Sequence, residues 1–201
     1  MRIIDETTWN RRQQFEHFKT FIDPHFAVTL AFDVSKAYAF SKNNHISFFG
    51  RYLHDCMKAI NDIENLRYRI LEGKLVEYDV IHASATISRE DHTFGFSFIE
   101  FDEDLGVFIK NLDKERKRIQ GSTDLFPPVN SMDCIYCSAL PWVDFSGHKE
   151  PLSRVWNSVP QLAFGKVQDG RMNVAISVNH ALADGYHLGL FAEKFQFYLN
   201  K

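Results

Sequence analysis

Hydrophobic and polar residues alternate along this 201-residue chain with a spacing that switches repeatedly between helical and strand periods. Helical spacing predicts four helices, the first starting at Trp9 and the others spanning Ser47 to Ile60, Asp104 to Ile119 and Gly185 to Leu199. Thr8 can cap the first helix, which carries Phe15, Phe18 and Phe21 on one side and is closed by Asp23-Pro24. Period-two alternation predicts strands at Phe26–Phe32, Tyr68–Leu71, Leu75–Tyr78, Ile81–Ser88, Thr93–Phe98, Cys134–Ser138, Leu162–Val167 and Met172–Val178. Gly73 and Gly170 mark hairpin turns. Because strands and helices do not alternate steadily, we expect an α+β fold with helices packed on a mixed, mostly antiparallel sheet.

The composition is that of an ordinary globular protein, with 45% hydrophobic and 24% charged residues. We expect a single domain over residues 1–201, because no repeat or linker interrupts the chain. A net charge of −3 gives no reason to expect nucleic-acid binding. The mixed-sign run at residues 114–118 is typical of a solvated helix face. The count of 19 phenylalanines is high, and several are candidates to line an apolar pocket rather than only to fill a core.

Three cysteines cannot all pair within one chain, which favours a reduced, cytoplasmic protein. Cys134 and Cys137 form an isolated CxxC on a predicted strand, where residues three apart face opposite sides. We therefore interpret them as structural thiols rather than metal ligands. No apolar run reaches the length of about 20 residues needed to span a membrane, and residues 1–6 lack the apolar core of a signal peptide.

His180 follows the last predicted strand, and Asp184-Gly185 then turns the chain into the last helix. A strand end or loop is where a scaffold usually presents a working side chain. The apolar residues 181–183 favour a neutral imidazole, as a general base requires. A metal site on His180, Asp184 and His187 would need a helix that starts before His180 and runs through Gly185, which the strand pattern up to Val178 disfavours. We expect no metal.

Three segments in order resemble the chloramphenicol acetyltransferase family over nearly the whole chain. The segment 179–187, Asn-His-Ala-Leu-Ala-Asp-Gly-Tyr-His, resembles the family signature HHxxxDGFH. The segment 9–15, Trp-Asn-Arg-Arg-Gln-Gln-Phe, is similar to its N-terminal Trp-x-Arg-(Arg/Lys)-x-x-Phe, and 138–142, Ser-Ala-Leu-Pro-Trp, to its Ser-(Ala/Cys)-(Leu/Ile)-Pro-Trp. The His-x-x-x-Asp-Gly element alone is shared with dihydrolipoamide acyltransferases.

The resemblance implies a two-layer sandwich, a homotrimer with an active site at each subunit interface, and acetyl-CoA as the acetyl donor to a hydroxyl of chloramphenicol or a related alcohol. His180 would be the general base, and Ser138 of the neighbouring subunit would hydrogen-bond the oxyanion. Asp184 would pair with Arg11 and, with the turn at Gly185, hold the histidine loop in shape. In the family, a contact of the histidine with its own backbone carbonyl sets its tautomer.

The resemblance also implies which residues bind the two substrates. Phe18, Ile22, Phe94 and Phe126 fall at acceptor-binding positions, while Trp142 and Lys166 fall at CoA-binding positions. Four positions depart from the pattern. His17 stands where an aromatic residue is usual, and Phe18 stands where tyrosine is common, so a hydroxyl is missing. Ala163 replaces a threonine of some members, and Asn179 replaces the first histidine of the signature. These departures affect which acceptor we expect the protein to bind more than they affect the expected acetyl-transfer chemistry.

Two other functions remain open from the sequence. One is a trimeric, non-catalytic small-molecule-binding protein of the same fold. The other is the core of a dihydrolipoamide-type acyltransferase, although no lipoyl-like domain or flexible linker is present in the sequence. Retention of both His180 and Ser138 favours the acetyltransferase, because a binding protein needs neither.

Overall fold

The computed structural model describes residues 1–151 and 158–201. Helices and strands are interspersed, as the hydrophobic pattern predicts. In chain order they are β1 (Arg2–Ile3), α1 (Arg12–Phe18), β2 (His25–Asp33), α2 (Ser35–Asn43), α3 (Phe48–Asn61), α4 (Glu64–Arg67), β3 (Tyr68–Leu71), β4 (Lys74–Glu77), β5 (His82–Ser88), β6 (Phe94–Phe96), α5 (Leu105–Gln120), β7 (Cys134–Ala139), β8 (Gln161–Gln168), β9 (Arg171–Asn179) and α6 (Gly185–Leu199). The α+β class is confirmed.

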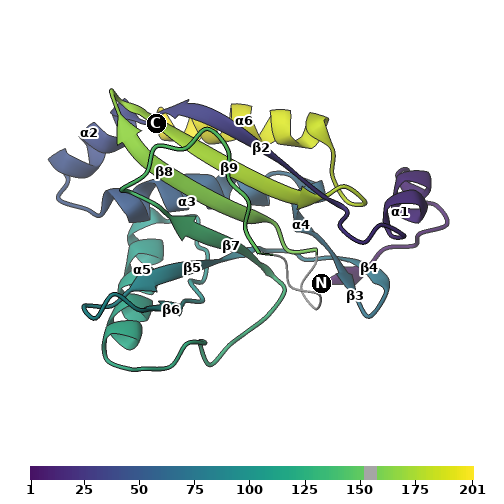
Figure 1. Ribbon diagram of the computed structural model, residues 1–201, viewed down its shortest axis with the longest axis horizontal. Coiled ribbons are helices and arrows are strands. Elements are labelled where there is room, and N and C mark those ends of the chain that lie inside the picture. Colours follow the sequence, from purple (N-terminus) through teal and green to yellow (C-terminus); the bar gives the residue numbers. More distant parts are fainter. Residues whose placement is uncertain (152–157) are drawn as a thin grey trace.

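The main sheet has six strands in the order β2-β9-β8-β7-β5-β6 (Figure 1). β7 is parallel to both β5 and β8, while β2·β9, β8·β9 and β5·β6 are antiparallel. A second sheet, β1-β4-β3, is antiparallel throughout. The prediction of a mixed, mostly antiparallel arrangement is therefore confirmed.

The two hairpins that join β3 to β4 and β8 to β9 turn where the sequence predicts. Glu72 and Gly73 have φ of 50° and 77°, and Asp169 and Gly170 have φ of 51° and 76°. Left-handed backbone at both central residues defines a type I′ turn, whose twist matches that of paired strands. The second hairpin fixes the register of β9 and hence the position at which that strand ends.

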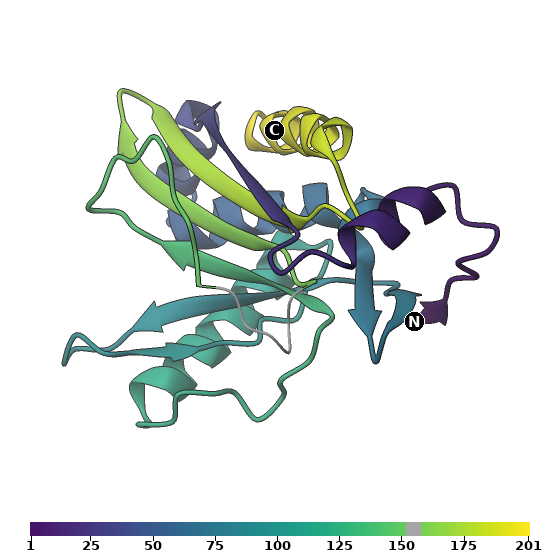
Figure 2. The same cartoon turned by 45° about the vertical axis from the view of Figure 1, so that its right-hand side comes forward.

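The three long helices begin at capped residues and bury one face. Ser47 and Asp104 accept the backbone N–H groups of Gly50 and Val107, so α3 and α5 start where predicted. In Figures 1 and 2, α3, α5 and α6 lie on one face of the main sheet. The main core fills the space between them, with Met57, Phe108 and Phe191 fully buried.

The opposite face of the sheet is crossed by the segment that follows β7 (Figures 1 and 2). Phe145 of this segment packs on Ala163 and Ala175 of β8 and β9. The small side chains at these two positions leave room for it. The segment is thereby held close to the end of β7 that carries Ser138.

Some predicted helix boundaries are wrong. α1 spans only Arg12–Phe18 and has no side-chain cap, because the Thr8 hydroxyl instead donates to the Asp5 carbonyl oxygen in the preceding turn. α2 is not predicted from the sequence at all. It buries only Ala37 and Ser41, so it lacks the apolar stripe that marks an amphipathic helix.

The cysteines are buried and unpaired. Cys137 packs in the main core and Cys134 in a separate cluster with Met132 and Val159, which agrees with opposite strand faces. Burial raises the pKa of the Cys134 thiol to about 12, so this sulfur is unreactive at neutral pH. Within residues 1–151 and 158–201, no helix has both the length and the apolar character to cross a membrane.

Candidate active site

His180 lies in the loop between β9 and α6, and contacts from three directions hold the backbone of this loop. The His180 N–H donates to the Pro24 carbonyl oxygen at 2.9 Å. The Asn65 side chain donates to the Leu182 carbonyl oxygen at 2.8 Å. The Asn179 side chain accepts the Ala181 N–H at 2.9 Å and is itself buried. The position of the imidazole is therefore set by the fold rather than by the loop alone.

The His180 ring has one nitrogen committed and one available. Nδ1 lies 3.1 Å from the Ala183 carbonyl oxygen, and a carbonyl only accepts, so Nδ1 carries the proton in this hydrogen bond. Nε2 then holds a lone pair, as a general base requires. The expectation that His180's own carbonyl sets the tautomer is corrected, because the loop turns the Ala183 carbonyl towards Nδ1 instead.

Two phenylalanines pack against this ring. Phe18 of α1 stacks on it with the ring centroids 4.2 Å apart and the planes 10° apart. Phe26 of β2 contacts it at 4.5 Å with a tilt of 41°. The stacking fixes the plane of the imidazole ring. Phe18 thus lies beside the candidate base, as expected for an acceptor-binding residue.

Arg11 and Asp184 form an ion pair beneath the histidine loop. The Arg11 guanidinium donates to Asp184 and also, at 3.3 Å, to the His180 carbonyl oxygen. Burial opposes the charge of Asp184, but the hydrogen bond and positive charge of Arg11 outweigh it, so the pKa of Asp184 lies below its ordinary value. Asp184 also accepts the Tyr186 N–H and caps α6, which begins at Gly185. The expected pairing is present in the structure.

His187 completes this helix start rather than a metal site. Its Nδ1 accepts the Asp184 N–H at 3.1 Å, and burial lowers the pKa of His187 below its ordinary value. Since α6 begins only at Gly185, His180 does not share a helical face with Asp184 and His187. Among the described residues, no group of three or more His, Cys, Asp or Glu side chains is placed to hold a metal ion.

Ser138 lies far from His180 of the same chain, two strands away from β9 and opposite the middle of that strand. It pairs with Ala163, which in turn pairs with Ala175, five residues before His180. At strand spacing this is about 17 Å along the sheet and about 10 Å across it, or about 20 Å in all. The hydroxyl group of one acceptor molecule therefore cannot contact both His180 and Ser138 of a single protomer.

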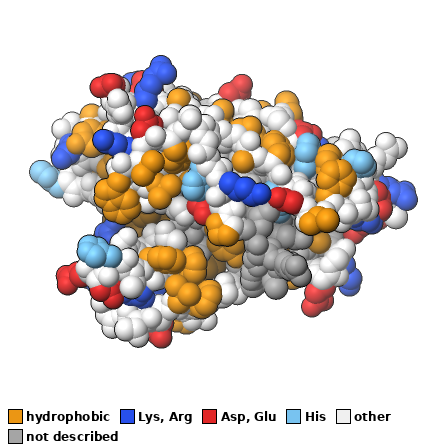
Figure 3. Space-filling model, viewed as in Figure 1, with side chains coloured by type: hydrophobic (Ala, Val, Ile, Leu, Met, Phe, Trp, Pro, Cys, Tyr) orange, Lys and Arg blue, Asp and Glu red, His pale blue; other side chains and the backbone are white. Residues whose placement is uncertain are grey.

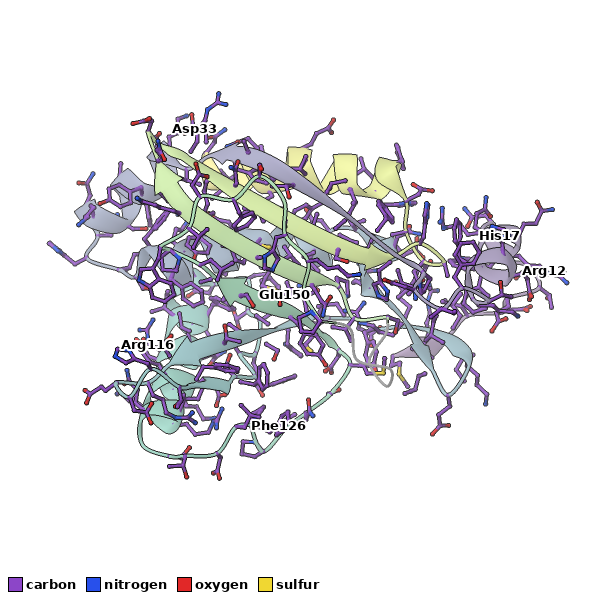
Figure 4. The ribbon with its side chains drawn as sticks, viewed as in Figure 1. Arg12, His17, Asp33, Arg116, Phe126 and Glu150 are labelled. Atoms are coloured by element: carbon purple, nitrogen blue, oxygen red, sulfur yellow. The ribbon has the colours of Figure 1, made fainter. Side chains whose placement is uncertain are left out.

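Some of the expected acceptor-binding residues lie near His180, and the others lie in the part of the sheet that carries Ser138 (the Ser138 end). Phe18 lies by His180, and Ile22 follows it in the fully exposed turn before β2. Phe94 and Phe126 instead pack around Phe96, with ring centroids 5.4 and 5.6 Å from it. In Figure 4, Phe126 lies at the lower edge of the molecule and His17 at its right-hand end.

Phe94, Phe96 and Phe126 (the Phe94 cluster) lie on the Ser138 side of the sheet. Phe96 pairs with Thr86, the residue after Ala85, and Ala85 pairs with Cys137. Phe94 and Phe126 remain about half exposed. Figure 3, which has the same view as Figure 1, shows several hydrophobic patches on the face turned to the reader. Phe18 thus borders His180, while the half-exposed Phe94 and Phe126 lie on the Ser138 side of the sheet, at or near β6, two strands from β7.

The two expected CoA-binding residues also lie near Ser138. Trp142 follows β7 in a tight turn and its side chain is 74% exposed. Lys166 is exposed on β8, and its N–H donates to the Val143 carbonyl oxygen at 2.9 Å. The pairing of β8 with β9 is irregular between Phe164 and Val167, which turns this part of β8 towards the Trp142 segment.

Three contributors to the site are not predicted from the sequence: Phe26, Asn65 and the carbonyl of Ala183. Each of them contacts the His180 loop or ring through a tertiary contact that the amino-acid pattern does not identify. Phe26 is predicted on a strand, but only the pairing of Phe26 with Val178 brings it beside His180. Nothing in the sequence indicates that the Asn65 side chain reaches the Leu182 carbonyl oxygen.

Comparison with known proteins agrees with the family resemblance. A family model described as chloramphenicol acetyltransferase matches residues 1–196. The chain is similar to the chloramphenicol acetyltransferase of Bacillus pumilus, with 28% identity covering 94% of this chain and 89% of that protein. It is 25% identical to that of Proteus mirabilis, covering 99% of this chain and 94% of that protein.

The fold comparison points the same way. A solved chloramphenicol acetyltransferase matches with a TM-score of 0.87 and 27% identity, covering 98% of this chain and 99% of that one. The dihydrolipoamide acetyltransferase of Azotobacter vinelandii has the same fold, with a TM-score of 0.71, 12% identity and coverage of 94% and 86%. The expected fold of CoA-dependent acyltransferases is therefore confirmed.

Proposed function

Because the chain belongs to the chloramphenicol acetyltransferase family, we propose that it transfers the acetyl group of acetyl-CoA to a hydroxyl of chloramphenicol or a related alcohol. The observation that carries this proposal is the His180 imidazole. Its Nδ1 is committed to the Ala183 carbonyl and its ring is stacked on Phe18, so Nε2 is the nitrogen left to accept a proton. A binding protein has no use for such an arrangement.

In the proposed reaction, His180 Nε2 removes the proton of the acceptor hydroxyl as its oxygen attacks the thioester carbonyl carbon. The Ser138 hydroxyl donates a hydrogen bond to the oxyanion that forms. When the carbon–sulfur bond breaks, the imidazolium of His180 returns the proton to the departing thiolate. Proton transfer by a positioned base is typically worth about 10²–10⁴-fold, and one oxyanion donor about 10²–10³-fold.

The separation of His180 and Ser138 supports a site shared between two copies of the chain. About 20 Å separates them within one protomer, so the two groups act together only when His180 of one copy faces Ser138 of another. The half-exposed Phe94 and Phe126, two strands from Ser138 in the same sheet, would then face Phe18 and Ile22 of the neighbour. We propose a homotrimer, as the family resemblance implies, because such a cyclic assembly places one site at each interface.

The donor fits the Ser138 end. The exposed indole of Trp142 offers an apolar surface for the pantetheine arm, and the Lys166 ammonium offers a positive charge for a phosphate of CoA. Both flank the strand that presents Ser138. The thioester would thereby arrive beside the oxyanion donor. The apolar acceptor surfaces favour an alcohol with a substantial hydrophobic face.

The direct test is release of free thiol from acetyl-CoA in the presence of chloramphenicol, followed with a coloured thiol reagent. The three cysteines of the chain are buried, so their contribution to the signal is small. We expect His180→Ala to reduce turnover by about 10²–10⁴-fold or more. His45→Asn is the matched control, because His45 is exposed between α2 and α3 with a left-handed backbone that asparagine tolerates.

Near-full turnover by His180→Ala would refute the assignment of the base. Absence of thiol release with chloramphenicol and with a panel of other alcohols would refute the acetyltransferase. If the wild-type protein still bound chloramphenicol in that case, a non-catalytic binding protein would be the better description.

A further inference from the structure

One arginine outside the catalytic groups binds every segment that builds the Phe94 cluster. Arg89 lies directly after β5 and is half-buried. Its guanidinium donates to the carbonyl oxygens of Ile119 (3.0 Å), Ser122 (2.9 Å), Phe94 (2.6 Å) and Asp124 (2.6 Å), and to the Thr93 hydroxyl (3.3 Å). No carboxylate is among these partners, so this side chain serves as a connector of backbone segments.

The five acceptors belong to two stretches that are far apart in sequence. Thr93 precedes β6 and Phe94 begins it, while Ile119 lies in the last turn of α5. Ser122 and Asp124 follow α5 in the connection to Phe126. A backbone hydrogen bond from the Phe96 N–H to the Leu125 carbonyl oxygen, at 2.7 Å, joins the same two stretches. The Phe96 and Phe126 rings stack where they meet. The relative position of Phe94 and Phe126 therefore depends on this junction.

Gly95 makes room for the guanidinium. A Cβ atom at this position would lie 2.9 Å from Arg89 Nη2 and 3.0 Å from the Ile119 side chain. Both are closer than a carbon atom normally approaches, so a side chain here displaces either the arginine or the end of α5. Glycine at 95 and arginine at 89 thus form one packed unit.

We propose that Arg89 is a positioning residue for the acceptor-binding surface. It holds β6 and the segment after α5 so that Phe94 and Phe126 present one continuous apolar wall to the alcohol. This inference rests on the proposed function, since it takes Phe94 and Phe126 to contact the acceptor. Arg89 itself contacts neither substrate. Its loss is expected to weaken acceptor binding without altering the base or the donor site.

The experiment measures steady-state kinetics of Arg89→Lys and Gly95→Ala with chloramphenicol and acetyl-CoA. A lysine keeps the charge but cannot span five acceptors with its compact ammonium group. We expect KM for chloramphenicol to rise about tenfold in both variants, while kcat and KM for acetyl-CoA stay within about threefold. Arg116→Ala is the matched control, because Arg116 forms an ion pair with Asp113 along α5, away from the Arg89 junction.

A double-mutant cycle separates positioning from general stability. In a Phe126→Ala background the wall is already lost, so Arg89→Lys should change KM for chloramphenicol by less than about twofold. A fall in melting temperature with unchanged KM would overturn the proposal, as would equal losses in kcat and in both KM values.

If the wild-type protein releases no thiol, the proposed function fails, and the same variants are judged by the dissociation constant of chloramphenicol in calorimetry. Unaltered binding in Arg89→Lys, or no binding by the wild-type protein, would then overturn the role of Arg89.

Discussion

The ion pair between Arg11 and Asp184 offers a quantitative test of how the histidine loop is held. Asp184→Asn removes the negative charge but keeps a side-chain oxygen that can accept the Tyr186 N–H and cap α6. The second hydrogen bond of Arg11, to the His180 carbonyl oxygen, remains possible. The substitution therefore isolates the charge of one partner.

The expected magnitude follows from burial. Breaking a buried ion pair costs about 3–5 kcal/mol, because it leaves one charge without its partner. The Arg11 side chain is 10% exposed but that of Asp184 is 34% exposed, so solvent screens part of the loss. We expect the free energy of unfolding to fall by about 1–3 kcal/mol. For a chain of this size each kcal/mol corresponds to about 2–4 °C in melting temperature.

The pH dependence gives a second, independent readout. The pKa of Asp184 is lowered in the folded protein, so its ion pair stabilises the fold above the unfolded pKa of about 3.9 and this contribution is lost as pH falls through the folded pKa. Asparagine does not titrate. The difference in stability between wild type and Asp184→Asn should therefore be largest at pH 7 and shrink below about pH 5.

The assay is urea denaturation at pH 7 and at several values between 5 and 3, at one fixed protein concentration because an oligomer's stability depends on concentration. Asp113→Asn is the control, since its pair with Arg116 is exposed and contributes at most about 1 kcal/mol. Equal stability of wild type and Asp184→Asn at pH 7, or a difference that is the same at every pH, would refute the reasoning.

Three further predictions concern other parts of the site and fold. Ser138→Ala should reduce kcat by about 10²–10³-fold with little change in either KM, and an unchanged kcat would remove Ser138 from the oxyanion role. Trp142→Ala should raise KM for acetyl-CoA but not for the alcohol, as initial-rate kinetics would reveal. Arg69→Met should lower stability by about 3 kcal/mol or more in urea denaturation, because four carbonyl oxygens, including those of Met132 and Cys134, lose a buried donor.

Elements with a strong local signal were predictable from the sequence. α3, α5 and α6 start within about one residue of their predicted first residues, since Ser47, Asp104 and the Asp184-Gly185 step carry the capping chemistry themselves. The two hairpins were equally predictable, because glycine relieves the left-handed backbone that a type I′ turn requires. By contrast, α2 was missed because its stability depends on contacts with other elements rather than on its own pattern.

In the candidate site, too, the features with a local sequence signal are predictable and those that depend on tertiary contacts are not. The residue types and the loop around His180 follow from a local motif, and the Arg11–Asp184 contact follows from the family resemblance. What the sequence alone does not reveal is the tertiary geometry, such as the carbonyl of Ala183 reaching Nδ1 and Phe26 reaching the ring. Arg89 was missed for the same reason, because its five partners come together only in the folded chain.

The measurement that tests the central claim most directly mixes two inactive variants. His180→Ala and Ser138→Ala subunits are dissociated together in denaturant, refolded in equal amounts, and assayed for thiol release. If each site takes His180 from one protomer and Ser138 from the next, every mixed trimer regains one intact site. Random reassembly should then restore about one quarter of wild-type activity. Activity no greater than that of the two variants refolded separately would contradict the shared site.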